Sequence, residues 1–168
     1  MTINCMVDLE TLGRKSGAAI LSIGAVIFDD KKDILGKSFY AKIAEPRGSV
    51  DMSTIMWWLR QSIEAKDVFT VKDAMSHEEA LAAFYKFYTD QKAARLWCYG
   101  AGFDEPILRG AVNGPPVPWN YSDVRCARTL YSLAGVQLTF DDKKHHNALE
   151  DAVQQAKAAL LALKRIAR

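Results

Sequence analysis

The chain has 168 residues, and its 22 Lys and Arg side chains nearly balance 20 Asp and Glu side chains, leaving a formal net charge of +2. Hydrophobic residues at 49% and charged residues at 25% are typical of globular proteins and exclude a disordered, collagen-like or disulfide-scaffold protein. The small net charge argues against a protein that grips duplex DNA broadly through its phosphates. We expect residues 1–168 to form a single domain, because a chain of this length can build one hydrophobic core.

The sequence predicts no association with a membrane. A transmembrane helix needs ~20 apolar residues, and the best apolar run, Ile20 to Phe28, is about half as long. Asp8 and Glu10 stand where a secretory signal would need apolar residues, so we expect a cytoplasmic protein. The three cysteines are odd in number, widely spaced and without a C-x-x-C pair, which predicts reduced thiols.

Strands are expected in the first part of the chain. Ile3 to Leu9 is apolar, and turn residues at Gly13 to Gly17 separate it from a second apolar run, Ala18 to Phe28. After a polar turn, Ile34 to Ile43 alternates loosely as a third strand does. The pattern predicts antiparallel strands at the start of the fold.

Helices and a further strand follow. A helix begins near Ser53, and a second begins at Ser76, where Glu79 completes a capping box. The other expected elements are a strand at Arg95–Tyr99 and helices at Asp104–Val112, Asp123–Leu133 and Ala148–Ile166. We therefore predict an α/β fold, with a mixed sheet of three antiparallel strands and later βα units, flanked by helices.

A pair of acids ends the first strand. Side chains alternate along a strand, so Asp8 and Glu10 share one face, with Cα atoms ~6.6 Å apart, while Val7 and Leu9 point the other way. The alternative is a frayed strand end with solvated acids. The apolar residues before the pair favour burial, which carboxylates tolerate when a metal or partner neutralises them.

Two later stretches carry further polar groups. Asp104 follows a glycine-rich turn at the carboxyl end of a strand, where α/β proteins place ligands, although an acid also suits the first turn of a helix. Asn147 is expected to cap the last helix, which places His146 in the preceding loop and Asp151 in the first turn. An imidazole in that loop can swing over a metal held by carboxylates. His145 competes with His146 for this place, and either could be a solvated loop histidine.

These stretches together form one pattern: Asp8, Glu10, Asp104, His146 and Asp151. The pattern resembles the three motifs of the DEDD superfamily of 3′-to-5′ exonucleases, in its histidine-bearing branch. The resemblance spans nearly the whole chain and implies a ribonuclease H-like fold. It departs from the family at Gly100, where many relatives have Asn, which puts one turn or substrate contact in doubt.

The resemblance implies an enzyme that hydrolyses single-stranded DNA or RNA from the 3′ end to nucleoside 5′-monophosphates, with two divalent cations, Mg²⁺ or Mn²⁺. By the family's pattern Asp8 would bridge both cations, Glu10 and Asp151 would complete one, and Asp104 would hold the other. His146 would take the proton from the attacking water. Relatives are often homodimers, and the resemblance implies a bacterial or phage origin.

Candidate substrate contacts lie near these motifs. Trp57 and Trp58 are ~100° apart on the expected helix, so at most one joins the core squarely and the other is free to stack on a base. Packing of both in the core is the alternative. The Trp pair followed by Gln61 resembles a compact bacterial and phage subgroup of these exonucleases. The other candidates are Thr11 in the first motif, Leu12 and Phe103 beside the terminal base, Gln61 after the Trp pair, and Arg125 or Arg128 at backbone phosphate.

Two other functions remain open at this point. A non-catalytic nucleic-acid-binding or assembly module could keep the fold without the reaction. An RNase H-like endonuclease would cut internally and would not need His146.

Overall fold

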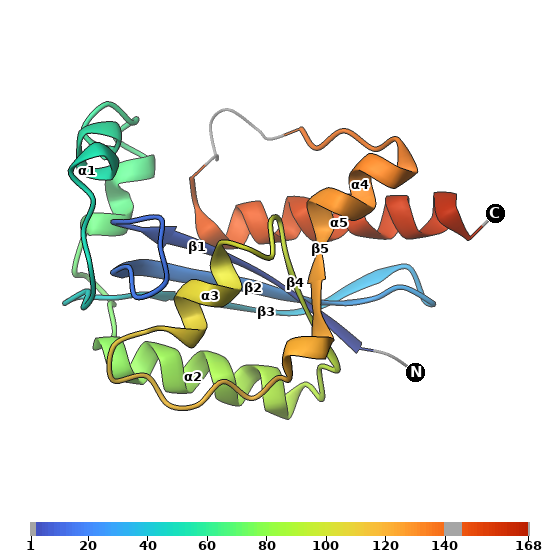
Figure 1. Cartoon of the computed structure of the whole chain (residues 1–168), viewed down its shortest axis with the longest axis horizontal. Helices are drawn as coiled ribbons and strands as arrows, with labels where there is room; N and C mark the ends of the chain where they lie inside the picture. The colour runs from blue at the N-terminus through green and yellow to red at the C-terminus, as the bar shows by residue number, and fades with distance from the viewer. Residues whose placement is uncertain (1–2, 140–145, 168) are drawn as a thin grey trace.

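A mixed sheet forms the centre of the structure, a computed structural model that describes residues 3–139 and 146–167 (Figure 1). β1 (Ile3–Thr11), β2 (Ile20–Asp29) and β3 (Ile34–Lys42) pair antiparallel, as predicted. β4 (Arg95–Cys98) and β5 (Val124–Cys126) add on the other side of β1, and both of these pairings are parallel. The strand order β3-β2-β1-β4-β5 therefore puts β1 in the middle of the sheet.

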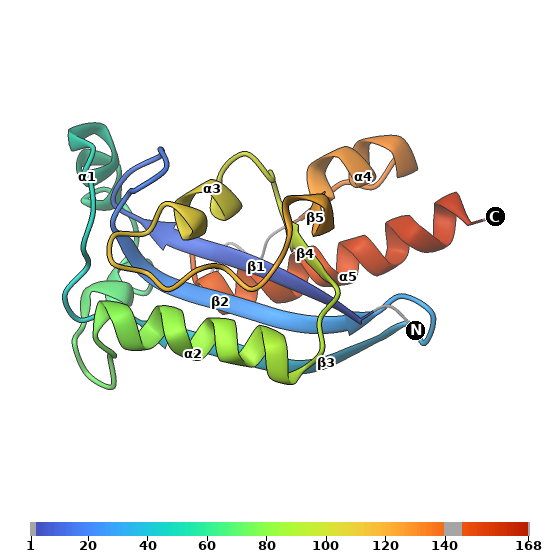
Figure 2. The same ribbon diagram turned by 60° about the horizontal axis from the view of Figure 1, so that its bottom comes forward.

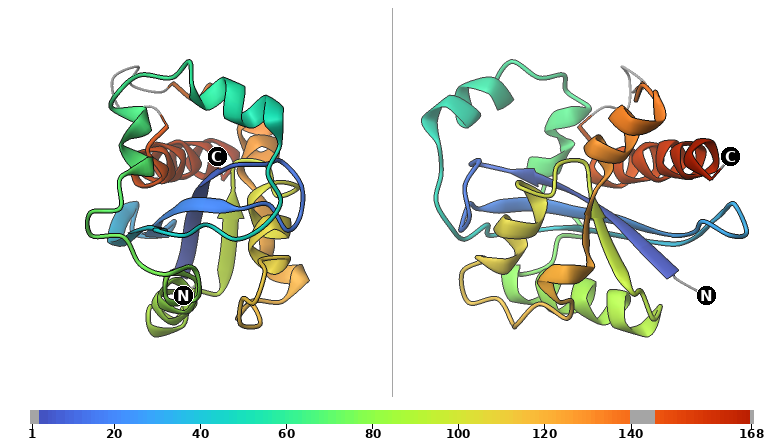
Figure 3. Two further views of the ribbon diagram at one scale, coloured as in Figure 1. Left: turned by 90° about the vertical axis from the view of Figure 1, so that its left-hand side faces the viewer. Right: turned by 45° about the vertical axis from the view of Figure 1, so that its right-hand side comes forward.

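Helices cover both faces of this sheet. They are α1 (Met52–Trp58), α2 (His77–Asp90), α3 (Asp104–Arg109), α4 (Ala127–Ala134) and α5 (Ala148–Ile166), with short 3-10 helices at Ala65–Phe69 and Tyr121–Asp123. Seen along the strands in the left panel of Figure 3, α5 lies on one face and α2 on the other. Figures 1 and 2 show α1 beyond the carboxyl end of β1.

The two faces of β1 contribute to separate parts of the core. Val7 and Leu9 are buried in a cluster that includes Leu81 of α2, whereas Met6 is buried in a cluster that includes Ala156 of α5. A strand with helices on both faces is apolar along its length, which explains the continuous apolar run at the start of the sequence. The polar side chains at the end of β1 consequently face α5.

Both predicted helix starts are confirmed. Ser76 Oγ accepts a hydrogen bond from the Glu79 N–H, and the Glu79 carboxylate accepts one from the Ser76 N–H, which completes the capping box of α2. Asn147 Oδ1 accepts hydrogen bonds from the N–H groups of Leu149 and Glu150 at the start of α5. α5 thus begins where the sequence predicts, with His146 ahead of it.

The helix predicted at Asp123–Leu133 is wrong in its first residues. Val124–Cys126 forms β5, with Val124 beside Leu96 and Cys126 beside Cys98 of β4. Pairing with β4 decides this conformation, because a segment of three residues is too short to show the alternation of a strand. The helix predicted at Asp104–Val112 also ends early, at Arg109, where Gly110 follows.

The cysteines agree with the expectation of reduced thiols. The thiols of Cys5, Cys98 and Cys126 are free, and the first two are buried. None of the described helices combines the length and the apolar character that crossing a membrane requires.

Candidate active site

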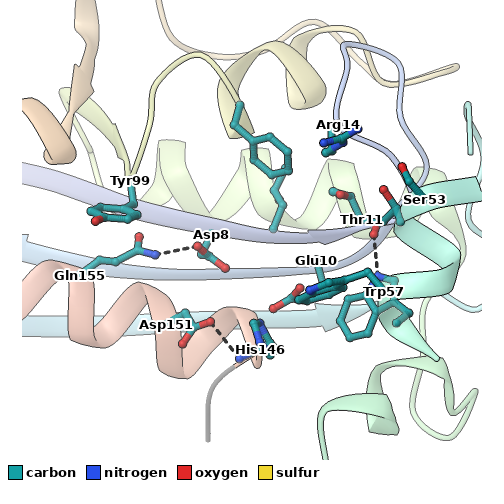
Figure 4. Close-up of a pocket in the computed structure, with 14 residues that line it drawn as sticks. Asp8, Glu10, Thr11, Arg14, Ser53, Trp57, Tyr99, His146, Asp151 and Gln155 are labelled. Carbon is teal, nitrogen blue, oxygen red and sulfur yellow. Dashed lines mark hydrogen bonds between the residues drawn. The ribbon is translucent and has the colours of Figure 1, made fainter. Parts of the chain in front are cut away.

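Asp8 and Glu10 project from the same face of β1 toward the start of α5 (Figure 4). Glu10 is 8% exposed, while Asp8 keeps partial exposure to the adjoining pocket. Val7 and Leu9, which alternate with the two acids, are buried in the core on the α2 side. The alternation predicted from the sequence is confirmed, and it directs both carboxylates to one place.

Gly24 allows α5 to approach this strand end closely. It lies opposite Asp8 in the β1–β2 pairing. A Cβ atom at Gly24 would lie 2.1 Å from the Ala148 carbonyl carbon and 2.2 Å from the Leu149 nitrogen. The first turn of α5 therefore rests directly on the backbone of β2, which brings Asp151 to the carboxylates of β1.

His146 and Asp151 are held together at the start of α5. The His146 backbone N–H donates to Asp151 Oδ2 at 3.1 Å, as Figure 4 shows. His146 has a φ of 68°, a left-handed conformation that few residues other than glycine adopt. Its ring meets Trp57 edge to face, with centroids 4.8 Å apart. The imidazole is thereby kept over the end of β1.

Asp104 reaches the same strand end from α3. It is the first residue of α3 and is 4% exposed. Its Oδ1 accepts a hydrogen bond at 3.2 Å from the N–H of Leu9, the residue between Asp8 and Glu10. The predicted acids from three separate stretches therefore converge on β1.

Part of this group has the spacing of a metal site. One donor atom from each of Glu10, His146 and Asp151 lies within 4.8 Å of the others. Carboxylate oxygens are the ligands that Mg²⁺ and Mn²⁺ prefer, and imidazole is also a metal ligand. The chemistry of the donors thus fits a divalent cation, with Asp8 and Asp104 adjacent.

The electrostatics of the carboxylates support the same conclusion. Burial, and then the charges of Asp151 and Asp104, raise the pKa of Glu10 to about 8. Burial raises the pKa of Asp104 to about 7, against the opposing effects of the Leu9 N–H and Arg128. Burial and the neighbouring carboxylates also raise the pKa of Asp8 well above its usual range. A cation among these groups would relieve both the repulsion and the loss of hydration.

A cavity of about 520 Å³ opens beside the carboxylates. α1 contributes Ser53, Thr54 and Trp57 to its wall, and the loop after β4 contributes Tyr99 and Phe103. Arg14, from the loop between β1 and β2, also lines it. The pocket therefore combines hydroxyl groups, aromatic rings and an arginine side chain around the carboxylates.

One of the two tryptophans is buried in the core and the other is exposed, which is the first of the two arrangements predicted from the sequence. Trp58 is 2% exposed, and its Nε1 donates to the Thr11 carbonyl oxygen at 2.9 Å, which ties α1 to the end of β1. Both tryptophans line the pocket, but Trp57 is 40% exposed. Only Trp57 of the pair presents much of its ring to a ligand.

The other candidate contacts are partly confirmed in position. Thr11 and Phe103 line the pocket. Leu12 and Gln61 do not: Leu12 packs on the cluster around Trp58, and the Gln61 amide donates to the Trp57 carbonyl oxygen at 2.9 Å. Neither side chain is therefore placed to contact a ligand in this pocket.

The two candidate arginines are outside the pocket lining. Arg125 donates to the Ser122 and Val124 carbonyl oxygens. Arg128 stacks on the Tyr99 ring, 4.8 Å from its centroid, and donates to the Tyr99 carbonyl oxygen. His145, the competitor of His146, lies outside the described residues.

Sequence reasoning missed several residues of the site. Gln155 follows Asp151 by four residues and so shares its helix face, a signal that was available in the sequence. Its Nε2 donates to Asp8 Oδ1 at 2.7 Å. Arg14, Ser53 and Tyr99 had no comparable signal, because loops and a short helix bring them to the pocket.

Comparison with known sequences gives a family. The model of the 3′-5′ exoribonuclease Rv2179c-like domain matches residues 3–163. An exodeoxyribonuclease of Enterobacteria phage T4 is 27% identical over 119 residues, which cover 61% of this chain and 52% of the phage protein. The match thus spans about half the length of that relative.

Comparison with solved structures gives the fold. The nuclease domain of 3′hExo, a DEDDh family member bound to rAMP, has a TM-score of 0.60 at 13% identity, covering 96% of this chain and 92% of that one. A zinc-bound complex of Escherichia coli exonuclease I with single-stranded DNA has a TM-score of 0.68 at 13% identity, covering 95% of this chain and 40% of that one. These neighbours confirm the ribonuclease H-like exonuclease fold. The chain belongs to the family of Rv2179c-like 3′-5′ exoribonuclease domains, whose model matches nearly its whole length.

Proposed function

We propose that this protein is a metal-dependent 3′-to-5′ exonuclease that hydrolyses single-stranded nucleic acid and releases nucleoside 5′-monophosphates. The convergence of Glu10, His146 and Asp151 at the end of β1 carries the proposal. Membership of the exonuclease family supports the direction of cleavage. We further propose that residues 1–168 act as one exonuclease domain.

Two divalent cations, Mg²⁺ or Mn²⁺, are the cofactors we propose, held by Asp8, Glu10, Asp104 and Asp151. When bound, such cations activate water and neutralise charge on the leaving oxygen. The buried acids themselves supply the oxygen ligands and the negative charge that such cations would neutralise. Because their pKa values are raised, they also exchange protons for cations near neutral pH.

His146 is the proposed general base. Its ring takes a proton from water as the water oxygen bonds to phosphorus and the bond from phosphorus to the 3′ oxygen breaks. The leaving oxygen gains a proton and becomes the 3′-hydroxyl of the shortened strand. The edge-to-face contact of Trp57 with the His146 ring and the hydrogen bond from the His146 N–H to Asp151 orient His146 for this step.

The pocket suits a terminal nucleotide. We propose that Trp57 and Phe103 contact its base or sugar, and that Arg14 contacts a phosphate. The side chain of Arg14 is mostly exposed, and its guanidinium is 3.9 Å from the Asp51 carboxylate, so it can turn toward an anion at small cost. The family model names RNA and the phage relative names DNA, so we propose single-stranded nucleic acid of either kind as the substrate class.

Three other features remain predictions: a cytoplasmic location, a bacterial or phage origin, and a homodimer. The phage relative supports the origin.

Digestion of a 5′-labelled single strand tests the proposal. The protein with Mn²⁺ should produce a ladder of products shortened from the 3′ end, and Asp8→Asn should produce none. Glu45→Gln, a change of an exposed acid that does not line the pocket, is the matched control and should cleave normally. Binding without cleavage would indicate a non-catalytic module, and cutting of a circular single strand would indicate an endonuclease. Matched DNA and RNA strands under identical salt show which sugar is preferred.

A further inference from the structure

Gln155 lies beside Asp8, one turn of α5 after Asp151. The residue is 1% exposed, and its Nε2 donates to Asp8 Oδ1 at 2.7 Å (Figure 4). Its backbone carbonyl oxygen accepts a hydrogen bond from the Tyr131 hydroxyl of α4. Gln155 is therefore fixed at its backbone and at the donor end of its side chain.

The other end of this side chain is unsatisfied. Gln155 Oε1 is buried and has no hydrogen-bond partner among residues 3–139 and 146–167. The amide turns its NH₂ group to Asp8, which can only accept hydrogen bonds when it is ionised to hold a cation, and this leaves Oε1 over. A buried acceptor without a partner destabilises the folded protein, and an apolar side chain of similar size would avoid this cost. Folding alone does not explain an amide at this position.

The geometry points to a role toward Asp8. Within the proposed metal-dependent function, we propose that Gln155 is a positioning residue: it fixes the Asp8 carboxylate through Oδ1 and leaves Oδ2 to a divalent cation. The Gln155 side chain lines the same pocket as Asp8, Glu10 and Asp151. Removing the amide frees the Asp8 carboxylate to rotate, and the cation then has to order it on binding.

A structural role for Gln155 predicts a different outcome. If the hydrogen bond served only to join α5 to β1, its loss would lower the stability of the metal-free protein and leave cation affinity unchanged. A positioning role predicts weaker cation binding, because the amide donor is lost. It also predicts unchanged or higher stability of the metal-free protein, because an apolar replacement removes the unsatisfied oxygen as well. Stability and affinity measured separately therefore distinguish the two roles.

Gln155→Met keeps the length of the side chain and removes the hydrogen bond. Mn²⁺ binding, measured by calorimetry and by electron paramagnetic resonance on chelator-treated protein, should weaken by about 10- to 100-fold, as is usual for residues that orient metal ligands. The melting temperature in chelator should stay the same or rise. At saturating Mn²⁺ the kcat should approach that of the wild type.

Gln154→Met is the matched control, because it makes the same change at the next residue of α5, which does not line the pocket. It should bind Mn²⁺ as the wild type does. Gln155→Leu provides a second replacement should the Met variant fail to fold. Wild-type affinity in a folded Gln155 variant, with a lower melting temperature in chelator, would overturn the positioning role alone. Absence of Mn²⁺ binding by the wild-type protein would overturn the proposed function as well.

Discussion

Trp57 meets His146 edge to face, with ring centroids 4.8 Å apart and planes at 85°. One side chain thus supports the proposed general base and also faces the pocket. Its neighbour Trp58 is buried and donates a hydrogen bond to β1. We therefore expect Trp57 to act mainly in the site and Trp58 mainly in stabilising the fold.

Trp57→Ala should lower kcat/KM by about 5- to 150-fold, because a base stacked on an aromatic ring is worth about 1–3 kcal/mol. The melting temperature should change little, since the side chain is 40% exposed. Trp58→Ala should instead cost about 3–5 kcal/mol of stability. Kinetics and thermal unfolding of both variants check this, and equal effects on stability would contradict the division.

His146→Ala should reduce kcat by about 10²- to 10⁴-fold, the usual contribution of a general base. The fold should persist, because the hydrogen bond from His146 to Asp151 uses the backbone N–H, which alanine keeps. Circular dichroism and single-turnover digestion measure the two effects. A variant as fast as the wild type would remove His146 from the mechanism.

Arg14→Ala should raise KM and reduce the dependence of binding on salt by one phosphate contact, a slope change of about 0.7 in a log–log plot for a single strand. Lys15→Ala is the control, since Lys15 is an exposed neighbour outside the pocket lining. Binding titrations at several salt concentrations give both slopes. Identical slopes for the two variants would place the phosphate elsewhere.

Gly24→Ala should displace the start of α5, because the new Cβ would fall 2.1 Å from backbone. Overpacking of this kind costs about 1–3 kcal/mol or more, and activity should fall further than stability alone explains. Gly36→Ala is the control, since its Cβ would lie 3.3 Å from side-chain atoms of Ile27 and 3.6 Å from the Ile27 carbonyl oxygen. Melting temperature and digestion rate are the readouts, and a fully active Gly24→Ala protein would contradict the close approach.

The metal-free protein should lose stability as pH rises toward about 8. The folded-state pKa of Glu10 is about 8 against an ordinary 4.5, and that of Asp104 is about 7 against 3.8. Between these values the unfolded chain has released protons that the folded protein retains, so the free energy of unfolding falls with increasing pH. Below the ordinary values and above the raised ones, the two acids add no further pH dependence.

Thermal unfolding in chelator near pH 5.5 and near pH 8.5 checks this sign, with a lower melting temperature expected at the higher pH. Glu10→Gln should reduce the difference. A cation at a hundredfold over its dissociation constant should add roughly 2.7 kcal/mol. Equal melting temperatures at both pH values would mean that the carboxylates are not crowded.

Local patterns in the sequence predicted the parts of the fold that depend on near neighbours. Alternation along β1 placed Asp8 and Glu10 on one face, and the Asn147 cap placed His146 ahead of α5. The D-x-E and H-x-x-x-x-D spacings were specific enough to indicate the family, which the match over residues 3–163 confirms.

Features that depend on distant parts of the chain could not be predicted in the same way. β5 forms because β4 pairs with it, and no local pattern in its three residues distinguishes it from a helix. Nothing in the sequence around Gly24 distinguishes it from other strand residues, although it decides how closely α5 approaches β2. Arg14 reaches the pocket through a loop whose path depends on tertiary packing.

Anomalous diffraction from crystals soaked in Mn²⁺ tests the central claim most directly. We expect strong manganese peaks at the end of β1, in contact with Asp8, Glu10, Asp104 and Asp151. Well-ordered crystals at millimolar Mn²⁺ with no peak there, or with peaks only elsewhere, would contradict it.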